Sequence, residues 1–132
     1  MADSGGEKGF DLSGEYCNLA NDYYMLGEYE KAIDFYSKAI DLNPDYADAY
    51  FNRGLALSKV QDFEKARLDY DKVIMLNPEL TAAYYTRGLI NEHTNQFQKA
   101  IQDYSKAMTI DPNHELAYKR IEIVKAKQSK AG

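Results

Sequence analysis

The sequence predicts an all-α fold of seven helices, arranged as three stacked hairpins and one closing helix. Small and aromatic residues recur at helical spacing, as at Tyr50 and Gly54. Proline ends each pattern at Pro44, Pro78 and Pro112, because its ring removes a backbone donor and pushes the preceding residue out of the helical region. These prolines lie 34 residues apart, and a fixed period of that length is typical of stacked helical repeats.

Four further positions keep their residue type through all three copies. They are Tyr16, Tyr50 and Tyr84; Ala20, Gly54 and Gly88; Ala32, Ala66 and Ala100; and Tyr36, Tyr70 and Tyr104. No single copy can bury its own apolar face, so the three hairpins must stack on one another. We expect the small residues of the second and third sets to face each other where the two helices of a hairpin cross. We expect the tyrosines of the last set to fill the space between units, with their hydroxyls at the surface.

This pattern resembles the tetratricopeptide repeat from Ser13 to about Gln128, nearly the whole chain. Each repeat begins with tyrosine where the family often has tryptophan, which keeps the aromatic shape. The resemblance implies a right-handed superhelical solenoid. It also implies that the first helix of each hairpin lines an inner, concave wall and the second helix an outer wall.

The repeat boundaries divide the chain into six segments. They are a flexible lead-in (1–12), three repeats (13–46, 47–80 and 81–114), a capping helix (115–128) and a tail (129–132). The six repeat helices are expected near 13–26, 29–42, 46–60, 63–76, 80–94 and 97–110. Phe10 or Leu12 of the lead-in is a candidate contact with the first helix.

The turns inside the hairpins differ in their residues. Gly27 suits the left-handed conformation that closes a helix, and Asn95 tolerates it. The middle turn has Gln61 and Asp62 and no glycine, so it is expected either to tolerate fewer residue types or to be slightly strained.

The last helix has the pattern of a cap. Polar residues Glu122 and Lys125 occupy positions that a further helix would bury. Ala117, Ile121 and Val124 should therefore seal the third hairpin, while the opposite face meets water.

Composition excludes several classes of protein. A content of 45% hydrophobic and 28% charged residues is too apolar for a largely disordered chain, and a net charge of -5 argues against nucleic-acid binding. No apolar run approaches the ~20 residues that span a bilayer, and the start lacks the pattern of a secretory signal. With a single cysteine, a reducing, cytoplasmic location and no membrane association are expected.

Enzymatic chemistry finds no support in the residue pattern. His93 and His114 lie in different helices without a cysteine pair nearby, so no metal site or cofactor is expected. Cys17 has no histidine partner in sequence, and acidic pairs such as Asp69 and Asp71 read as solvated helix positions. We therefore expect a protein that is not an enzyme.

Function is expected on the inner faces of the first helices, at side chains that stacking does not use. Counting along each helix gives Cys17, Asn21 and Tyr24; Phe51, Asn52, Leu55 and Lys59; Tyr85, Thr86, Leu89 and Glu92; and Lys119, Arg120 and Ile123. Phe51, Leu55, Tyr85 and Leu89 form a candidate apolar patch for a partner, unless they only pack neighbouring helices together.

Polar residues flank this patch. Asn21 and Asn52 are placed to hold the backbone of an extended peptide, if they are not simply solvated. Lys119 and Arg120 add positive charge at the C-terminal end, which suits a ligand carboxylate but is also common on a solvated helix.

Three functions remain open at the sequence level. The first is a protein–protein interaction module that binds a peptide or helix of a partner in the groove. The second is a structural scaffold that self-associates into a homo-oligomer. The third is a co-chaperone that binds a chaperone C-terminal tail, as one branch of the family does.

The chaperone-binding branch uses two lysines, two asparagines and an arginine as its clamp. Those positions hold Cys17, Asn21, Asn52, Ala82 and Thr86 here. The asparagines match but every cation is missing, and a bare carboxylate gains little without them.

Overall fold

The computed structural model describes residues 11–131, which form seven helices and no strand. The helices are α2 (Leu12–Met25), α3 (Tyr29–Leu42), α4 (Ala47–Lys59), α5 (Phe63–Leu76), α6 (Thr81–His93), α7 (Phe97–Ile110) and α8 (Glu115–Ala131). Phe10 and the rest of 1–10, together with Gly132, lie outside the described residues.

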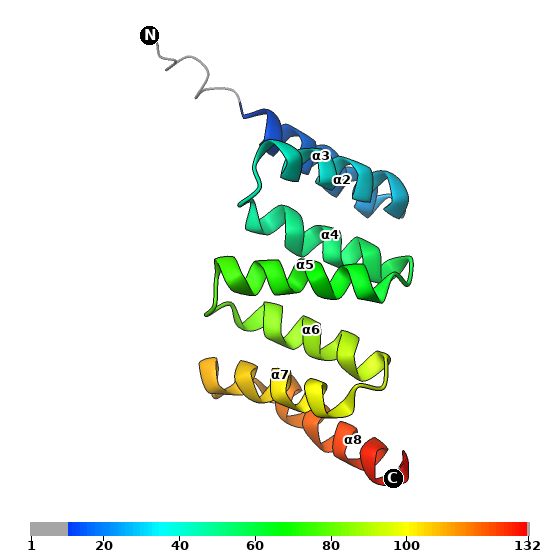
Figure 1. Ribbon diagram of the computed structural model, residues 1–132, viewed down its shortest axis with the longest axis vertical. Coiled ribbons are helices and arrows are strands. Elements are labelled where there is room, and N and C mark those ends of the chain that lie inside the picture. Colours follow the sequence, from blue (N-terminus) through cyan, green and yellow to red (C-terminus); the bar gives the residue numbers. More distant parts are fainter. Residues whose placement is uncertain (1–10, 132) are drawn as a thin grey trace.

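The helices lie across the long axis of the molecule, one after another, with α2 and α8 at opposite ends (Figure 1). Consecutive helices pair as α2–α3, α4–α5 and α6–α7, and α8 packs on α7. The prediction of an all-α stack of three hairpins and a closing helix is confirmed. None of the described helices has the length and apolar composition that crossing a bilayer requires.

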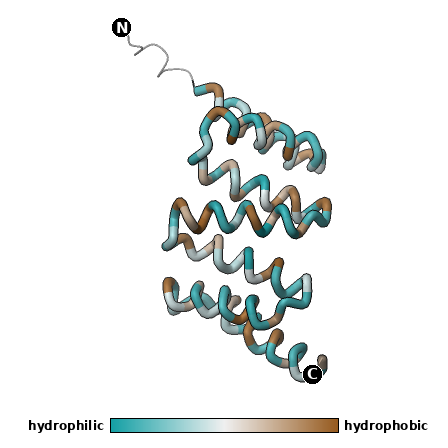
Figure 2. The backbone as a smooth tube through the Cα atoms, in the orientation of Figure 1, coloured by the Kyte–Doolittle hydropathy of each residue, from teal (hydrophilic) through white to brown (hydrophobic). Residues whose placement is uncertain are grey.

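Hydrophobic and hydrophilic residues alternate along every helix (Figure 2). Each helix therefore has one face for its neighbours and one face for solvent. On α8 the buried residues are Ala117, Ile121 and Val124, which pack with Tyr84 and Tyr104. The predicted sealing face of the cap is confirmed.

The cap helix is longer than the sequence pattern indicates. It ends at Ala131 rather than near Gln128, so Ser129, Lys130 and Ala131 are helical instead of forming a tail. No proline or glycine stands between Gln128 and Ala131 to stop the helix.

The three hairpin turns share one backbone geometry. Gly27, Gln61 and Asn95 all have positive φ, at 78°, 66° and 62°. In the middle turn the N–H of Asp62 donates to the carbonyl of Leu57 at 2.9 Å, a bond that satisfies a free carbonyl at the helix end. Gln61 thus holds a conformation that disfavours residues with a Cβ.

In the second and third hairpins the small residue of the first helix packs against a tyrosine of the second helix. A Cβ built on Gly54 would lie 2.7 Å from the ring of Tyr70, and one on Gly88 would lie 2.7 Å from the ring of Tyr104. The sequence pattern did not indicate that the tyrosine, and not only the alanine of the second helix, restricts residue 54. Ala66 is fully buried, but the atoms nearest to Gly54 belong to the tyrosine.

The buried tyrosines also differ from expectation at their hydroxyls, which bond to first-helix groups rather than reach the surface. Tyr70 donates to the carbonyl of Phe51 at 3.2 Å, and Tyr104 donates to Glu92 Oε1 at 2.8 Å. Burial raises the pKa of Tyr70. These bonds fix the depth at which the second helix sits against the first.

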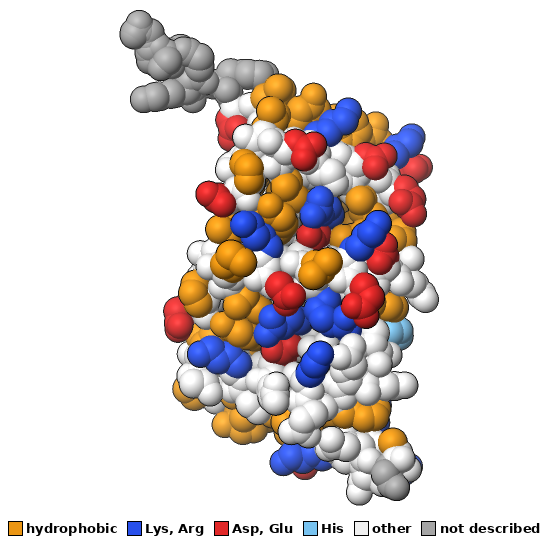
Figure 3. All heavy atoms as spheres, viewed as in Figure 1, with side chains coloured by type: hydrophobic (Ala, Val, Ile, Leu, Met, Phe, Trp, Pro, Cys, Tyr) orange, Lys and Arg blue, Asp and Glu red, His pale blue; other side chains and the backbone are white. Residues whose placement is uncertain are grey.

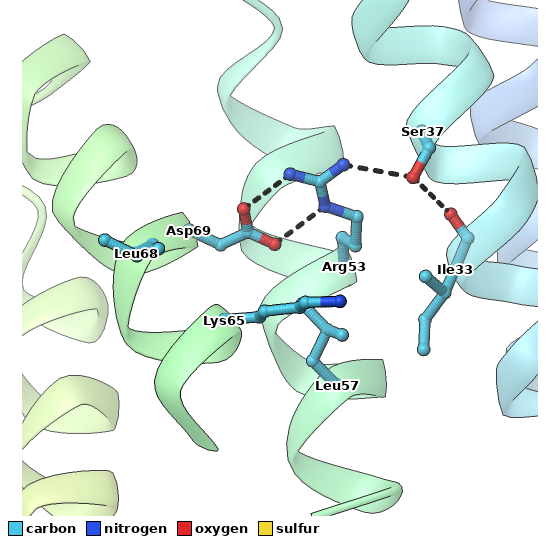
Figure 4. Close-up of a pocket in the computed structure, with 7 residues that line it drawn as sticks. All are labelled: Ile33, Ser37, Arg53, Leu57, Lys65, Leu68 and Asp69. Carbon is cyan, nitrogen blue, oxygen red and sulfur yellow. Dashed lines mark hydrogen bonds and ion pairs between the residues drawn. The ribbon is translucent and has the colours of Figure 1, made fainter. Parts of the chain in front are cut away.

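Buried ion pairs join the two helices of a hairpin, and the same arginines also reach the preceding hairpin. Arg53 donates to both carboxylate oxygens of Asp69, at 2.8 and 2.7 Å, and to Ser37 Oγ at 3.0 Å (Figure 4). The hydrogen bonds to Asp69 raise the pKa of Arg53. Asp69 is 4% exposed, so its reading as a solvated residue is wrong.

The same arrangement recurs one repeat later. Arg87 donates to both oxygens of Asp103, at 3.0 and 2.7 Å, and to Asp71 at 2.8 Å. The face in Figure 3 accordingly shows acidic and basic side chains close together, with no large area of one sign. This outer face is therefore held by its own charge pairs.

Candidate functional site

Three adjacent hollows follow the inner faces of the first helices. The first is lined by Asn21, Tyr24, Met25, Tyr36, Asn52 and Leu55. The second is lined by Tyr24, Leu55, Ser58, Lys59, Gln61, Phe63, Thr86, Leu89, Ile90 and His93. The third is lined by Leu89, Glu92, His93, Arg120 and Lys127.

Shared residues make these hollows one groove. Tyr24 and Leu55 belong to the first and second hollows, and Leu89 and His93 belong to the second and third. The groove thus runs from α2 across α4 and α6 to α8. Below, "the groove" means these three hollows.

The middle hollow is the largest of the three, and more of its exposed lining is apolar than polar. Its volume is about 380 Å³, against about 230 and 320 Å³ for its neighbours. Leu55 and Leu89 occupy equivalent positions on α4 and α6, and Leu89 is 38% exposed. Phe63 packs against His93 with its ring tilted by 45° and the ring centroids 4.7 Å apart, and both side chains line this hollow. A large apolar side chain of a ligand would find matching surface here.

The first hollow is edged by amides. Asn21 Oδ1 accepts hydrogen bonds from the hydroxyl of Tyr36 and from Asn52 Nδ2, the latter at 3.3 Å. Tyr36 thereby fixes the Asn21 side chain, which leaves the amide N–H groups of Asn21 for other acceptors. The burial of Tyr36 also raises its pKa, so the hydroxyl stays a donor.

The third hollow combines a buried acid with two cations. Glu92, 4% exposed, accepts from Tyr104 at 2.8 Å, from Arg120 Nε at 3.0 Å and from Lys127 Nζ at 2.7 Å. Burial alone raises the pKa of Glu92, but the hydrogen bonds from Arg120, Lys127 and Tyr104 outweigh it and lower this pKa to about 2. The carboxylate is therefore charged at neutral pH.

Most of the residues predicted from the sequence line this groove. Those that do are Asn21, Tyr24, Asn52, Leu55, Lys59, Thr86, Leu89 and Arg120. Glu92 lines it too, but as a buried ion-pair partner rather than as an exposed groove residue. Ile123 is 41% exposed on α8 and lines none of the three hollows.

Three predicted residues are used in packing instead. Cys17 is 3% exposed and belongs to the core around Ala20, and burial raises the pKa of its thiol. Phe51 packs edge-on against Tyr70, with ring centroids 5.2 Å apart. Tyr85 lies 5.5 Å from the ring of Tyr104 and 4.8 Å from that of His114.

Cys17, Phe51 and Tyr85 occupy equivalent positions, so one explanation covers all three. The side chain at that position points toward the second helix of its hairpin. There it packs near the buried tyrosine of that helix, which is Tyr36, Tyr70 or Tyr104. Lys119, at the same position on α8, has no hairpin partner and is exposed, with Glu115 3.7 Å away. The expected patch of four apolar residues is therefore reduced to Leu55 and Leu89.

Sequence reasoning missed several groove residues. They are Met25, Tyr36, Ser58, Gln61, Phe63, Ile90, His93 and Lys127. A signal for three of them was present, because Met25, His93 and Lys127 occupy the repeat position of the predicted residue Lys59. Within residues 11–131, no group of three or more His, Cys, Asp or Glu side chains is arranged to hold a metal ion.

Comparison with protein families matches most of this chain to repeat models. A model described as TPR repeat matches residues 20–61, and a model described as tetratricopeptide repeat matches residues 47–80 and 81–114. Human serine/threonine-protein phosphatase 5 is 52% identical over 42 residues. That match covers 32% of this chain and 8% of the phosphatase, so the likeness concerns only a small part of that enzyme.

Solved structures resemble the whole stack. The first TPR domain of Spaghetti (RPAP3), bound to the HSP90 peptide SRMEEVD, is 27% identical with a TM-score of 0.82. The match covers 91% of this chain and 94% of that one. MamA is 26% identical with a TM-score of 0.87, over 90% of this chain and 70% of that one.

Proposed function

This chain belongs to the tetratricopeptide repeat family, and from that premise we propose that it is a protein–protein interaction module. Its ligand is an extended segment of a partner protein, held in the groove. The observation that carries this proposal is the continuity of the three hollows through Tyr24, Leu55, Leu89 and His93.

The chemistry of the groove suits an extended chain rather than a small molecule. An extended segment exposes backbone groups that need partners, and the amides of Asn21 and Asn52 stand at the first hollow. The middle hollow between Leu55 and Leu89 takes one large side chain. Three hollows that follow one another through shared residues match a ligand with several side chains in sequence.

The structural neighbour that holds a chaperone peptide supports peptide binding by this fold. It does not favour the same ligand here. The positions where the chaperone-binding branch carries cations hold Cys17, which is buried, Ala82 and Thr86. We therefore propose a partner segment that differs from a chaperone tail.

Display of a random peptide library against the chain tests the proposal. Bound peptides are expected, and SRMEEVD, the peptide held by the structural neighbour, serves as the reference for their affinity. The site is then located by methyl NMR, with Leu55 and Leu89 shifting and Leu68, on the outer side of α5, unchanged. Shifts confined to residues outside the groove would reject the assignment.

Self-association is the competing function. Light scattering after size exclusion distinguishes the two, because a groove that serves a different partner leaves the chain monomeric. A stable dimer or larger assembly whose formation blocks the NMR shifts of Leu55 and Leu89 would favour the scaffold instead.

A further inference from the structure

The third hollow is built around more positive than negative charge. Arg120 and Lys127 both contact Glu92, and no other carboxylate lines this hollow. Two cations share one carboxylate, although the whole chain carries a net charge of -5. The surplus positive charge thus lies at one end of the groove.

Donors remain available on both cations. Arg120 uses Nε and Nη2 on Glu92, which leaves Nη1 without a partner among residues 11–131. The ammonium of Lys127 has three donors and gives one to Glu92. Their side chains are 30% and 47% exposed, so a second carboxylate can approach from the groove.

Glu92 holds these donors in place. Its carboxylate is itself fixed by a hydrogen bond from the hydroxyl of Tyr104, a fully buried residue of α7. Arg and Lys side chains lose much rotamer freedom when they are fixed, and here the loss is already incurred in the folded protein. A ligand carboxylate therefore meets preorganised donors.

A further cation, Lys59, lies on the same rim of the groove. Lys59, His93 and Lys127 occupy the same repeat position on α4, α6 and α8. Lys59 is exposed and has no carboxylate within 4.0 Å among the described residues. Leu55 and Leu89 share the position one turn earlier, so the apolar middle hollow lies beside this rim.

We propose, building on the proposed function, that the groove selects a segment in which an acidic side chain lies near a large apolar one. The apolar side chain enters the hollow between Leu55 and Leu89. The carboxylate of an aspartate or glutamate binds Arg120 and Lys127 in the third hollow, and Lys59 attracts further acidic residues. This acidic subsite lies on the cap helix, away from the clamp positions 17, 82 and 86.

The test begins with the peptides selected by display on the whole chain. Enrichment of aspartate or glutamate near an apolar residue is the expected result. For one such peptide, Lys127→Gln should weaken binding about tenfold, and replacing the peptide's acid by its amide should remove that effect. Lys125→Gln, an exposed lysine on the same helix, should leave the affinity unchanged.

A second arm separates two sources of the carboxylate. Amidation of the peptide's C-terminus should not change the affinity, because the proposed acid is a side chain. Loss of binding on amidation would overturn the assignment in favour of a terminal carboxylate.

Failure of this inference is distinguishable from failure of the proposed function. If peptides without acidic residues bind and shift Leu55 and Leu89, and Lys127→Gln behaves like Lys125→Gln, the acidic subsite is rejected while the groove stands. If no peptide shifts Leu55 or Leu89, the proposed function itself fails and the subsite with it.

Discussion

The ring of Tyr70 lies so close to Gly54 that a Cβ on residue 54 would sit 2.7 Å from Tyr70 Cε2. Gly88 and Tyr104 repeat the relation. Glycine therefore lets the two helices of these hairpins approach until the ring fills the space between them. This contact sets the position of α4 and α6, and with it the spacing of Leu55 and Leu89.

Gly54→Ala should destabilise the protein by about 1–3 kcal/mol through overpacking. The sign of the change in unfolding free energy distinguishes overpacking from helix propensity, because alanine in an unobstructed helix stabilises by about 1 kcal/mol relative to glycine. Urea unfolding measures the difference. In the double variant Gly54→Ala with Tyr70→Leu the added cost of the alanine should shrink, and an additive result would contradict the clash.

Gln61→Gly should stabilise the protein by about 1 kcal/mol. Residue 61 has φ of 66°, a region that costs residues with a Cβ about 1–2 kcal/mol. Gly27→Ala, at the equivalent turn with φ of 78°, is the matched reverse change and should destabilise. Thermal melting of both variants checks the pair, and opposite shifts are required.

Asp69→Ala should cost about 3 kcal/mol, because it leaves the Arg53 guanidinium partly buried and unpaired. The double variant Arg53→Leu with Asp69→Ala should be less damaging than Asp69→Ala alone. Chemical denaturation of the two variants tests this order. A double variant that is no more stable than Asp69→Ala alone would show that an unpaired Arg53 guanidinium carries no free-energy cost.

Much of this fold can be predicted from the sequence, because the same pattern of residue types occurs in three successive copies. The tyrosines, small residues and prolines identify each hairpin, and Ala117, Ile121 and Val124 identify the sealing face of the cap. The charged residues do not follow such a pattern. Asp69 reads as exposed until the fold brings Arg53, 16 residues away, against it.

The groove could be predicted only in part, for the same reason. Phe51 and Leu55 lie one turn apart on α4, and helical spacing alone gives both the same face. Only the packing of α5 decides that Phe51 meets Tyr70 while Leu55 lines the groove. His93 and Lys127 join the site because α6 and α8 carry them to one rim.

The acidity of Glu92 predicts a pH dependence. Its pKa is lowered to about 2 from an ordinary value of 4.5, so its contribution to stability is complete above about pH 4.5. It is lost as the pH falls toward 2, because the unfolded chain takes up the proton first. Glu92→Gln should cost roughly 3 kcal/mol at pH 7, and its difference from the unaltered protein should shrink between pH 4.5 and pH 2.

Urea unfolding at several pH values provides this comparison. Glu122→Gln, an exposed acid on α8, is the control and should show little change at any pH. A difference for Glu92→Gln that stays constant down to pH 2 would contradict the ion-paired state of this carboxylate.

The most direct measurement is the affinity of a display-selected peptide for two matched double variants. Leu55→Gln with Leu89→Gln alters the middle hollow, and Leu68→Gln with Met75→Gln alters two exposed apolar residues on the outer helix α5. We predict that the first pair loses at least about tenfold in affinity at unchanged helicity and that the second pair binds as the unaltered chain does. Equal affinity of both pairs would contradict the assignment of the groove as the binding site.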